Sequence, residues 1–261
     1  MVPGDPETLP GALGAAHAPV PGDTEELRLA PGQADELRLA PGDADELLLA
    51  PGDADELLLW ALMARFERLA LDRYVALAPA LADAGAGAKR AWVARLDALP
   101  TDAAALAASP LAPPTDALLA RAQSADETAV LLVQGLVLEH LGQAIYRVAE
   151  GTERASDASR SLARDGLAAS RAVTAAAARR TADAVGSGED LYRTFTDHTH
   201  EVLGALDALA DPVDAVFGAR FGLRFADVMG EFVADLVAAG TALGMQRRKI
   251  VAHLAGACMG L

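Results

Sequence analysis

The chain has 261 residues and a formal net charge of −15, and 52% of its residues are hydrophobic although only 4% are aromatic. Most of the non-aromatic hydrophobic residues are alanine and leucine, the strongest helix formers. This composition argues against a β-sheet. The acidic balance argues against a nucleic-acid-binding surface, because binding phosphates needs basic side chains. We therefore expect an all-α protein, an antiparallel bundle of six to eight helices.

The negative charge is concentrated at the N-terminus. Residues 1–59 contain 13 acidic and 2 basic side chains, whereas residues 60–261 have a net charge of only −4. Residues 1–20 are rich in Pro, Gly and Ala without any periodicity, which predicts a disordered leader. This leader has no basic segment followed by an apolar one, so it does not resemble a secretory signal.

A decapeptide is repeated four times between Pro21 and Trp60, in the stretch "PGDTEELRLAPGQADELRLAPGDADELLLAPGDADELLLW". Each copy has a Pro-Gly turn, a capping-box spacing such as that of Asp53 and Glu56 (with Gln33 in place of the aspartate in the second copy), and then leucines, so each is predicted to start a helix. In the first three copies the next Pro-Gly ends that helix. No proline follows the fourth copy until Pro79, which predicts a first long helix over 54–78 and a repeat segment over 21–52.

The rest of the chain, 53–261, is predicted to be the helical bundle. Helix signals and apolar spacing indicate further helices over 89–99, 124–149, 156–185, 189–210, 213–221 and 224–257. The segment 124–149 is apolar on most sides and is therefore expected to be the central helix. A connection with several prolines suggests a subdomain boundary near 100–115.

Cysteine content and hydropathy bear on the location of the protein. Cys258 is the only cysteine, so no disulfide forms within the chain, and no run of about 18 uncharged apolar residues predicts a membrane span. The chain has 20 arginines and 2 lysines, which together with its alanine content suggests a bacterium with a GC-rich genome. We expect a cytoplasmic protein.

The densest group of polar side chains is the sequence DHTHE, residues 197–201. On a helix, Asp197 shares a face with His200, and His198 shares one with Glu201. A carboxylate and an imidazole three residues apart suit a metal ion. The favoured interpretation is a solvated helix surface on which each carboxylate contacts its neighbouring histidine.

A second group, Glu139 and His140, lies inside the apolar central helix. A buried carboxylate needs a partner, because burying an isolated charge costs several kcal/mol or more. The favoured interpretation is a salt bridge from Glu139 to Arg147 or to an arginine on a neighbouring helix. The alternative is that Glu139 binds a metal.

The stretch "LLVQGLVLEHLGQAIYRVAEG" resembles a helix of the ferritin-like superfamily, in which an inward glutamate precedes an aromatic residue by about two turns. The resemblance implies a four-helix bundle that binds two irons and reacts with oxygen or peroxide. It would make Glu139 an iron ligand, with Asp197, His198, His200 and Glu201 supplying a carboxylate–histidine pair and Glu67 and Glu231 completing the set. The chain departs from the family pattern because it contains no Glu-x-x-His.

Two functions are therefore weighed, and the sequence leaves open whether the chain is an enzyme. The first is a non-enzymatic interaction or scaffold protein that uses no cofactor and binds a protein partner through residues 21–52. Its partner-binding side chains would be the leucines of the repeats, Leu27, Leu29, Leu37, Leu39, Leu47, Leu48 and Leu49. Small-residue helix faces such as Gly240 and Gly244 suggest a homo-oligomer. The alternative is a ferritin-like oxidoreductase or iron-binding protein with two iron or manganese ions.

Overall fold

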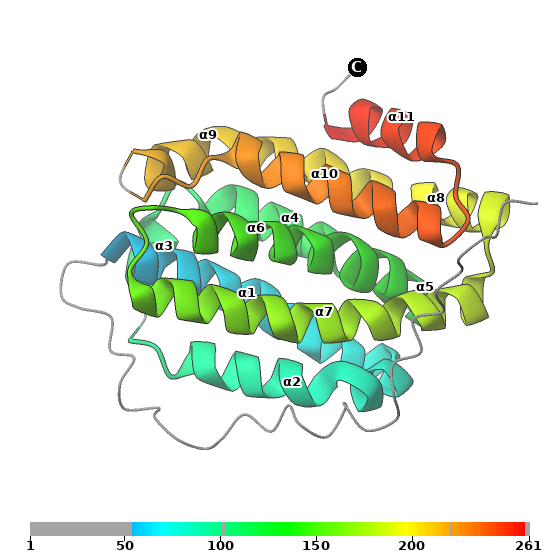
Figure 1. Cartoon of the computed structure of the whole chain (residues 1–261), viewed down its shortest axis with the longest axis horizontal. Helices are drawn as coiled ribbons and strands as arrows, with labels where there is room; N and C mark the ends of the chain where they lie inside the picture. The colour runs from blue at the N-terminus through cyan, green and yellow to red at the C-terminus, as the bar shows by residue number, and fades with distance from the viewer. Residues whose placement is uncertain (1–53, 101–102, 220, 259–261) are drawn as a thin grey trace, which may run out of the picture. The chain divides into compact units, whose positions relative to one another are not determined.

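The computed structural model describes residues 54–100, 103–219 and 221–258, and within 80–86 it describes the backbone alone. All regular secondary structure in these ranges is helical, which confirms the predicted all-α bundle (Figure 1). The leader 1–20, the repeats 21–52 and the seven repeat leucines lie outside the described residues. Their predicted roles stay predictions.

The first two helices are α1 (Ala54–Leu77) and α2 (Pro79–Asp97). Helix α1 agrees with the predicted range, and it buries a face that includes Trp60, Met63 and Tyr74. Helix α2 begins ten residues before its predicted start at Lys89. The sequence interpretation treated Pro79 only as the end of α1, but proline also suits the first position of a helix, where no backbone donor is needed.

Two short helices, α3 (Ala103–Ala108) and α4 (Ala112–Arg121), form the predicted proline-rich connection. Leu106, Leu111 and Leu118 from this segment belong to the same buried cluster as Trp60 of α1. The connection therefore contributes to the core of the bundle.

The central helix consists of α5 (Glu127–Ala129), a π-helical segment η1 (Val130–Leu138) and α6 (Glu139–Gly151). Asp126 caps its start by accepting a hydrogen bond from the backbone N–H of Ala129 at 2.8 Å, so the cap lies two residues after the predicted one at Ser124. The helix is apolar and long enough to cross a membrane, but 89% of its most apolar window is buried inside the bundle. It is the core helix, as predicted.

Helix α7 (Asp157–Val185) is the long alanine-rich helix, and it ends at Gly186, whose φ of 92° favours glycine. Its N-cap residue, Ser156, donates two hydrogen bonds to the carboxylate of Glu56 on α1, from its backbone N–H and from its hydroxyl, both at 2.7 Å. The glutamate of the fourth repeat copy therefore joins the start of α1 to the start of α7.

The C-terminal part contains α8 (Gly188–Leu206), the short turns η2 (Asp207–Leu209), α9 (Ala210–Val213) and η3 (Asp214–Gly218), and then α10 (Phe225–Ala242) and α11 (Arg247–Cys258). The single helix predicted over 224–257 is wrong. The chain reverses at Gly244, which has a φ of 86°, and the backbone N–H of Met245 bonds to the carbonyl of Gly240 at 3.0 Å. This Schellman-type ending lets α11 pack on α8.

Substituting alanine for glycine is expected to have opposite effects at two helical positions. A Cβ added at Gly166 would lie 2.7 Å from the ring of Tyr146 and 2.9 Å from that of Trp92, whereas one at Gly230 would meet nothing within 4 Å. Gly166→Ala should destabilise the protein by about 1–3 kcal/mol through overpacking. Gly230→Ala should stabilise it by about 0.5–1 kcal/mol through lower backbone entropy in the unfolded state. Urea denaturation of both variants checks this, and stabilisation by Gly166→Ala would contradict the packing.

The contact of α11 with α8 is expected to weaken in acid. His253 on α11 is half-buried, lies 3.2 Å from the Thr199 hydroxyl, and packs edge-on against Phe195 with ring centroids 5.6 Å apart. Burial lowers the pKa of His253, and the neighbouring His200 lowers it further. The folded state favours neutral His253. The contribution of this histidine to the free energy of unfolding is therefore complete above the unfolded pKa of about 6.5, and it decreases as the pH falls below that value.

Amide hydrogen exchange measures this effect directly. Protection of the α11 amides should be lower at pH 5.5 than at pH 7.5, relative to the amides of α7. The loss should shrink in His253→Gln, which cannot be protonated. Equal protection of α11 at both pH values in the unsubstituted protein would show that His253 does not control this contact.

Candidate functional site: a buried lysine between two glutamates

Four helices surround the centre of the bundle: α1, α2, the η1–α6 helix and α7 (Figure 1). Helix α2 packs against both α1 and α7, and α6 packs against α7. Each of α1, α2 and α6 places one charged side chain in this centre, namely Glu67, Lys89 and Glu139. All three residues are at most 4% exposed. A charged group as buried as this is rare unless it is paired.

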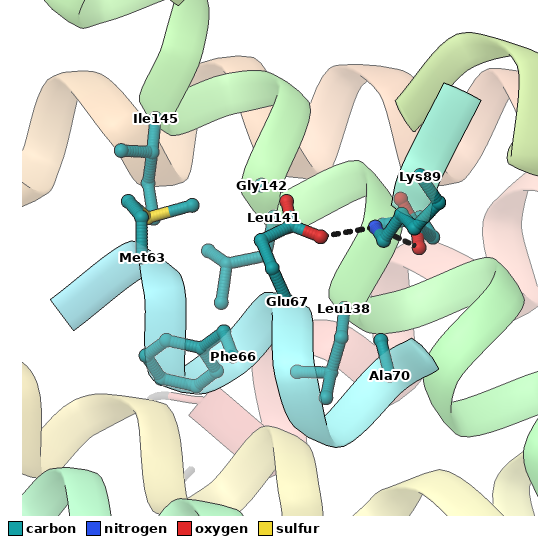
Figure 2. Close-up of a pocket in the computed structure, with 10 residues that line it drawn as sticks. Met63, Phe66, Glu67, Ala70, Lys89, Leu138, Leu141, Gly142 and Ile145 are labelled. Atoms are coloured by element: carbon teal, nitrogen blue, oxygen red, sulfur yellow. Dashed lines mark hydrogen bonds and ion pairs between the residues drawn. The ribbon is translucent and has the colours of Figure 1, made fainter. Parts of the chain in front are cut away.

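The lysine joins the two glutamates. Its ammonium Nζ forms an ion pair with Oε2 of Glu67 and another with Oε1 of Glu139, the latter at 2.5 Å. Figure 2 shows Glu67 from α1 and Lys89 from α2 pointing toward one another. The two carboxylates thus share a single cation, the Lys89 ammonium, which lies between them.

Hydroxyl groups also donate hydrogen bonds to the two carboxylates. Tyr146 of α6 donates to Oε1 of Glu67, Tyr74 of α1 donates to Oε1 of Glu139 at 2.8 Å, and Ser170 of α7 donates to Oε2 of Glu139 at 2.6 Å. These bonds join all four helices through one polar network. Such a network is stabilising only when its members find partners, and here each charged residue has at least two.

An aromatic cluster supports the network from one side. The indole N–H of Trp92 donates to the hydroxyl of Tyr146 at 3.0 Å, and that of Trp60 donates to Ser159 at 3.0 Å. The rings of Trp60 and Tyr146 are stacked with centroids 6.3 Å apart, and Trp92 stands edge-on to both. The orientation of Tyr146, and through it that of Glu67, is therefore fixed by packing.

The environment keeps the lysine charged and the phenols neutral. Burial alone lowers the pKa of Lys89, but Glu139 and Glu67 together raise it by more, so its net pKa lies above the usual value. Burial raises the pKa of Glu67, against the opposing effect of Lys89. Burial and the adjacent carboxylates raise the pKa of Tyr74 and of Tyr146 well above the usual value. At neutral pH the centre thus contains an ammonium and hydroxyl donors.

A small cavity adjoins these charges. Its volume is about 20 Å³, and its walls include Met63, Phe66 and Ile145 together with Glu67 and Lys89 (Figure 2). A cavity holds one water molecule when its volume reaches about 10–15 Å³. This space therefore suits about one water molecule and is too small for an organic substrate.

The predicted pairing of Glu139 with Arg147 is wrong. Arg147 instead forms salt bridges with Glu231, at 3.0 Å, and with Asp235, both on α10. The two residues lie eight positions apart on one helix, slightly more than two turns. Their side chains therefore point to different neighbours: Arg147 faces α10, whereas Glu139 faces α1 and α2. His140, the neighbour of Glu139, is buried with its Nδ1 2.5 Å from the carbonyl of Leu136, and burial lowers its pKa.

The other predicted metal ligands do not meet at this centre. Asp197, His200 and Glu201 are exposed on α8, His198 is half-buried there, and Glu231 is held by Arg147 on α10. Of the predicted set, the structure brings together only Glu67 and Glu139. Among the described residues, no group of three or more His, Cys, Asp or Glu could hold a metal ion.

Lys89 is the site residue that sequence reasoning missed. It begins the helix predicted over 89–99, and Trp92, a large apolar residue three positions later, favours burial of that face. Residues three apart share a helix face, so the spacing already placed Lys89 on the buried side. That a lysine is needed there follows only from the two glutamates, which lie 22 and 50 residues away along the chain.

No protein-family model matches the sequence, and no curated protein matches it either. Among solved structures, the chain is similar to a Synechococcus chain described as protein 19 with aldehyde deformylating oxidase activity. The two share 16% sequence identity with a TM-score of 0.47, over 77% of this chain and 92% of the other.

The cofactor prediction is corrected in both of its forms. The expectation of no cofactor is withdrawn. The alternative, two iron or manganese ions held by the predicted ligand set, conflicts with the placement of those ligands and with the ammonium between Glu67 and Glu139. What this chain shares with the solved structure is a helical architecture.

Proposed function

We propose that the chain is a helical-bundle interaction protein, in which a stable folded body displays the acidic repeats of residues 21–52 to a protein partner. The observation that supports this most is the closed centre of the bundle. The two central carboxylates form ion pairs with Lys89, and the adjoining cavity of about 20 Å³ cannot admit an organic substrate. A body with a closed centre of this kind is suited to interaction through its surface.

The charge distribution supports the choice of the repeats as the binding segment. Residues 1–59 have a net charge of −11 and the remainder has −4, so a basic partner is attracted to one end of the chain. Each copy combines acidic residues with leucines, a pattern that suits a short amphipathic helix bound in an apolar groove. Copies in tandem raise the apparent affinity through effective concentration.

The proposal is tested with the full chain and two variants. One variant lacks residues 1–50, and the other keeps the full length but has serine at the seven repeat leucines from Leu27 to Leu49. A photo-crosslinker placed at Glu36 in the full chain should capture one partner in the source cells, and that partner, once purified, should bind the full chain but neither variant. The thermal transition of the body should stay within about 2 °C in both variants.

Two outcomes would overturn the proposal. If the deletion lowers the melting temperature by more than about 10 °C, the N-terminal segment belongs to the folded core. If the serine variant binds the purified partner as tightly as the full chain does, the repeat leucines are not the binding side chains.

A second candidate is an oxidoreductase, and the observation that favours it is the polar centre, where two carboxylates and two phenols from α1 and α6 meet inside the bundle. The activity to assay first is that of the Synechococcus protein, aldehyde deformylation with oxygen. The full chain, purified without chelators, is incubated with an aldehyde in the presence of oxygen, with Glu139→Gln as the matched control. Formate release that depends on Glu139 would favour this candidate over the interaction protein.

A further inference from the structure

The polar centre can be compared with the arrangement that carboxylate-bridged two-metal bundles use. In those bundles two helices each supply one inward glutamate, and the other two each supply a glutamate followed three residues later by a histidine. The same four-helix framework is present here, with α1 and α6 contributing the single glutamates Glu67 and Glu139. The remaining helices of the centre are α2 and α7, and their inward positions decide whether the donor set is complete.

Helices α2 and α7 present two matching tetrapeptides at these positions. Helix α2 has Lys89-Arg-Ala-Trp92, and α7 has Ser170-Arg-Ala-Val173. The first and last residue of each tetrapeptide are buried, with exposures of 1–3%, and Lys89 and Ser170 both contact Glu139. The spacing of the two-metal pattern is thus retained, but an ammonium and a hydroxyl stand in place of the glutamates, and an indole and an isopropyl group stand in place of the imidazoles.

These donors do not fit a metal ion. A protonated lysine has three N–H donors and no lone pair, so it cannot be a ligand, and neither Trp92 nor Val173 offers one. Two carboxylates without a cation would repel each other in a buried site, because like charges there disfavour ionisation. The ammonium of Lys89 supplies the positive charge that the two glutamates require.

We infer that Lys89 is a built-in counterion at the position that a metal ion occupies in two-metal helical bundles. Its Nζ is held by Glu67 and Glu139. Ser170 and Tyr146 donate to the carboxylate oxygens that the ammonium does not contact, and Tyr74 donates to Oε1 of Glu139, the oxygen that the ammonium also contacts. The inference concerns this one position and does not depend on which partner the repeats bind. Its consequence is that removal of the lysine side chain leaves two buried carboxylates that can hold an external cation.

The experiment uses the full chain with Lys89→Ala, which removes the ammonium and leaves space beside the two carboxylates. Mn²⁺ is the probe, and ethylammonium chloride at the same ionic strength is a second, non-ligating cation. The melting temperature of Lys89→Ala should rise by about 5 °C in 1 mM Mn²⁺, and by less in ethylammonium. After desalting, Lys89→Ala should retain about one manganese more per chain than the unsubstituted protein.

The matched control is the triple variant Lys89→Ala, Glu67→Gln and Glu139→Gln, which has the same space without the carboxylates. It should show neither the rise in melting temperature nor the bound manganese. The inference is overturned if the unsubstituted protein takes up manganese with the same shift as Lys89→Ala, because the position would then be open. It is equally overturned if neither cation stabilises Lys89→Ala more than the triple variant.

A measurement on the unsubstituted protein decides the matter if Lys89→Ala does not fold. The ¹⁵N resonance of the Lys89 side chain should show a protonated ammonium up to a pH above 10.5, since the folded pKa is raised above that ordinary value. A neutral amine at pH 8 would overturn the inference, because an uncharged amine balances neither carboxylate. Lys249, which pairs with Glu189 on the surface, supplies the reference signal.

Discussion

Replacing Lys89 with methionine is expected to lower the free energy of unfolding by about 3–5 kcal/mol, one of the largest effects of a single substitution in this chain. Methionine fills much of the same space, so the loss comes from charge and not from a cavity. The two carboxylates of Glu67 and Glu139 would remain buried with only hydroxyl donors around them. Chemical denaturation at pH 7 measures the difference.

The companion variant separates charge from packing. Adding Glu67→Gln and Glu139→Gln to Lys89→Met removes all three charges, and a neutral centre of similar volume is often as stable as the ion pairs that it replaces. The triple variant should therefore recover most of the lost stability. A Lys89→Met protein that unfolds like the unsubstituted one would mean that the two carboxylates are not buried as the structure has them.

The second large effect is expected at Trp60. Trp60→Ala should cost about 3–5 kcal/mol, because the side chain is fully buried and its removal leaves a cavity between Tyr146 and Trp92. The hydroxyl of Ser159 also loses its donor. Thermal and urea unfolding check the value, with Trp60→Phe expected to cost less because it keeps the stacking on Tyr146.

An exposed position on the same helix is the control for Trp60. Val75 is 50% exposed, so Val75→Ala should change the free energy of unfolding by less than about 0.5 kcal/mol. If Trp60→Ala and Val75→Ala had similar effects, α1 would not pack in the bundle through the Trp60 face.

Local signals in the sequence were sufficient for much of the fold. The fourth Pro-Gly and the absence of proline before Pro79 gave the extent of α1, and the glycines after Val185 gave the end of α7. Signals with two meanings were misread. Pro79 ends one helix and begins the next, and Gly244, taken as a small residue inside a helix, has a positive φ that reverses the chain.

The candidate site was less accessible from the sequence. Glu67 and Glu139 were both named, because a carboxylate in an apolar helix must have a partner. The sequence does not identify that partner, because an arginine, a metal ion and a lysine can each supply the positive charge that a buried carboxylate needs. Only the packing of α2 against α1 and α7 brings Lys89 to them, and its ion pair with Glu139 joins residues 50 apart in the chain, which no local pattern encodes.

The hydrogen bonds between Glu56 and Ser156 and the burial of Trp60 together fix how the described part of the fourth copy, residues 54–60, joins the body. The third and fourth copies, PGDADELLLA and PGDADELLLW, differ only at their tenth residue, which is Ala50 in one and Trp60 in the other. Both copies carry a glutamate at the sixth position, but alanine at the tenth position could not fill the space of the buried indole. A single aromatic side chain thus distinguishes the copy that joins the bundle. Whole copies can consequently be gained or lost upstream in steps of ten residues, which would change the length and charge of the N-terminal segment without altering this junction.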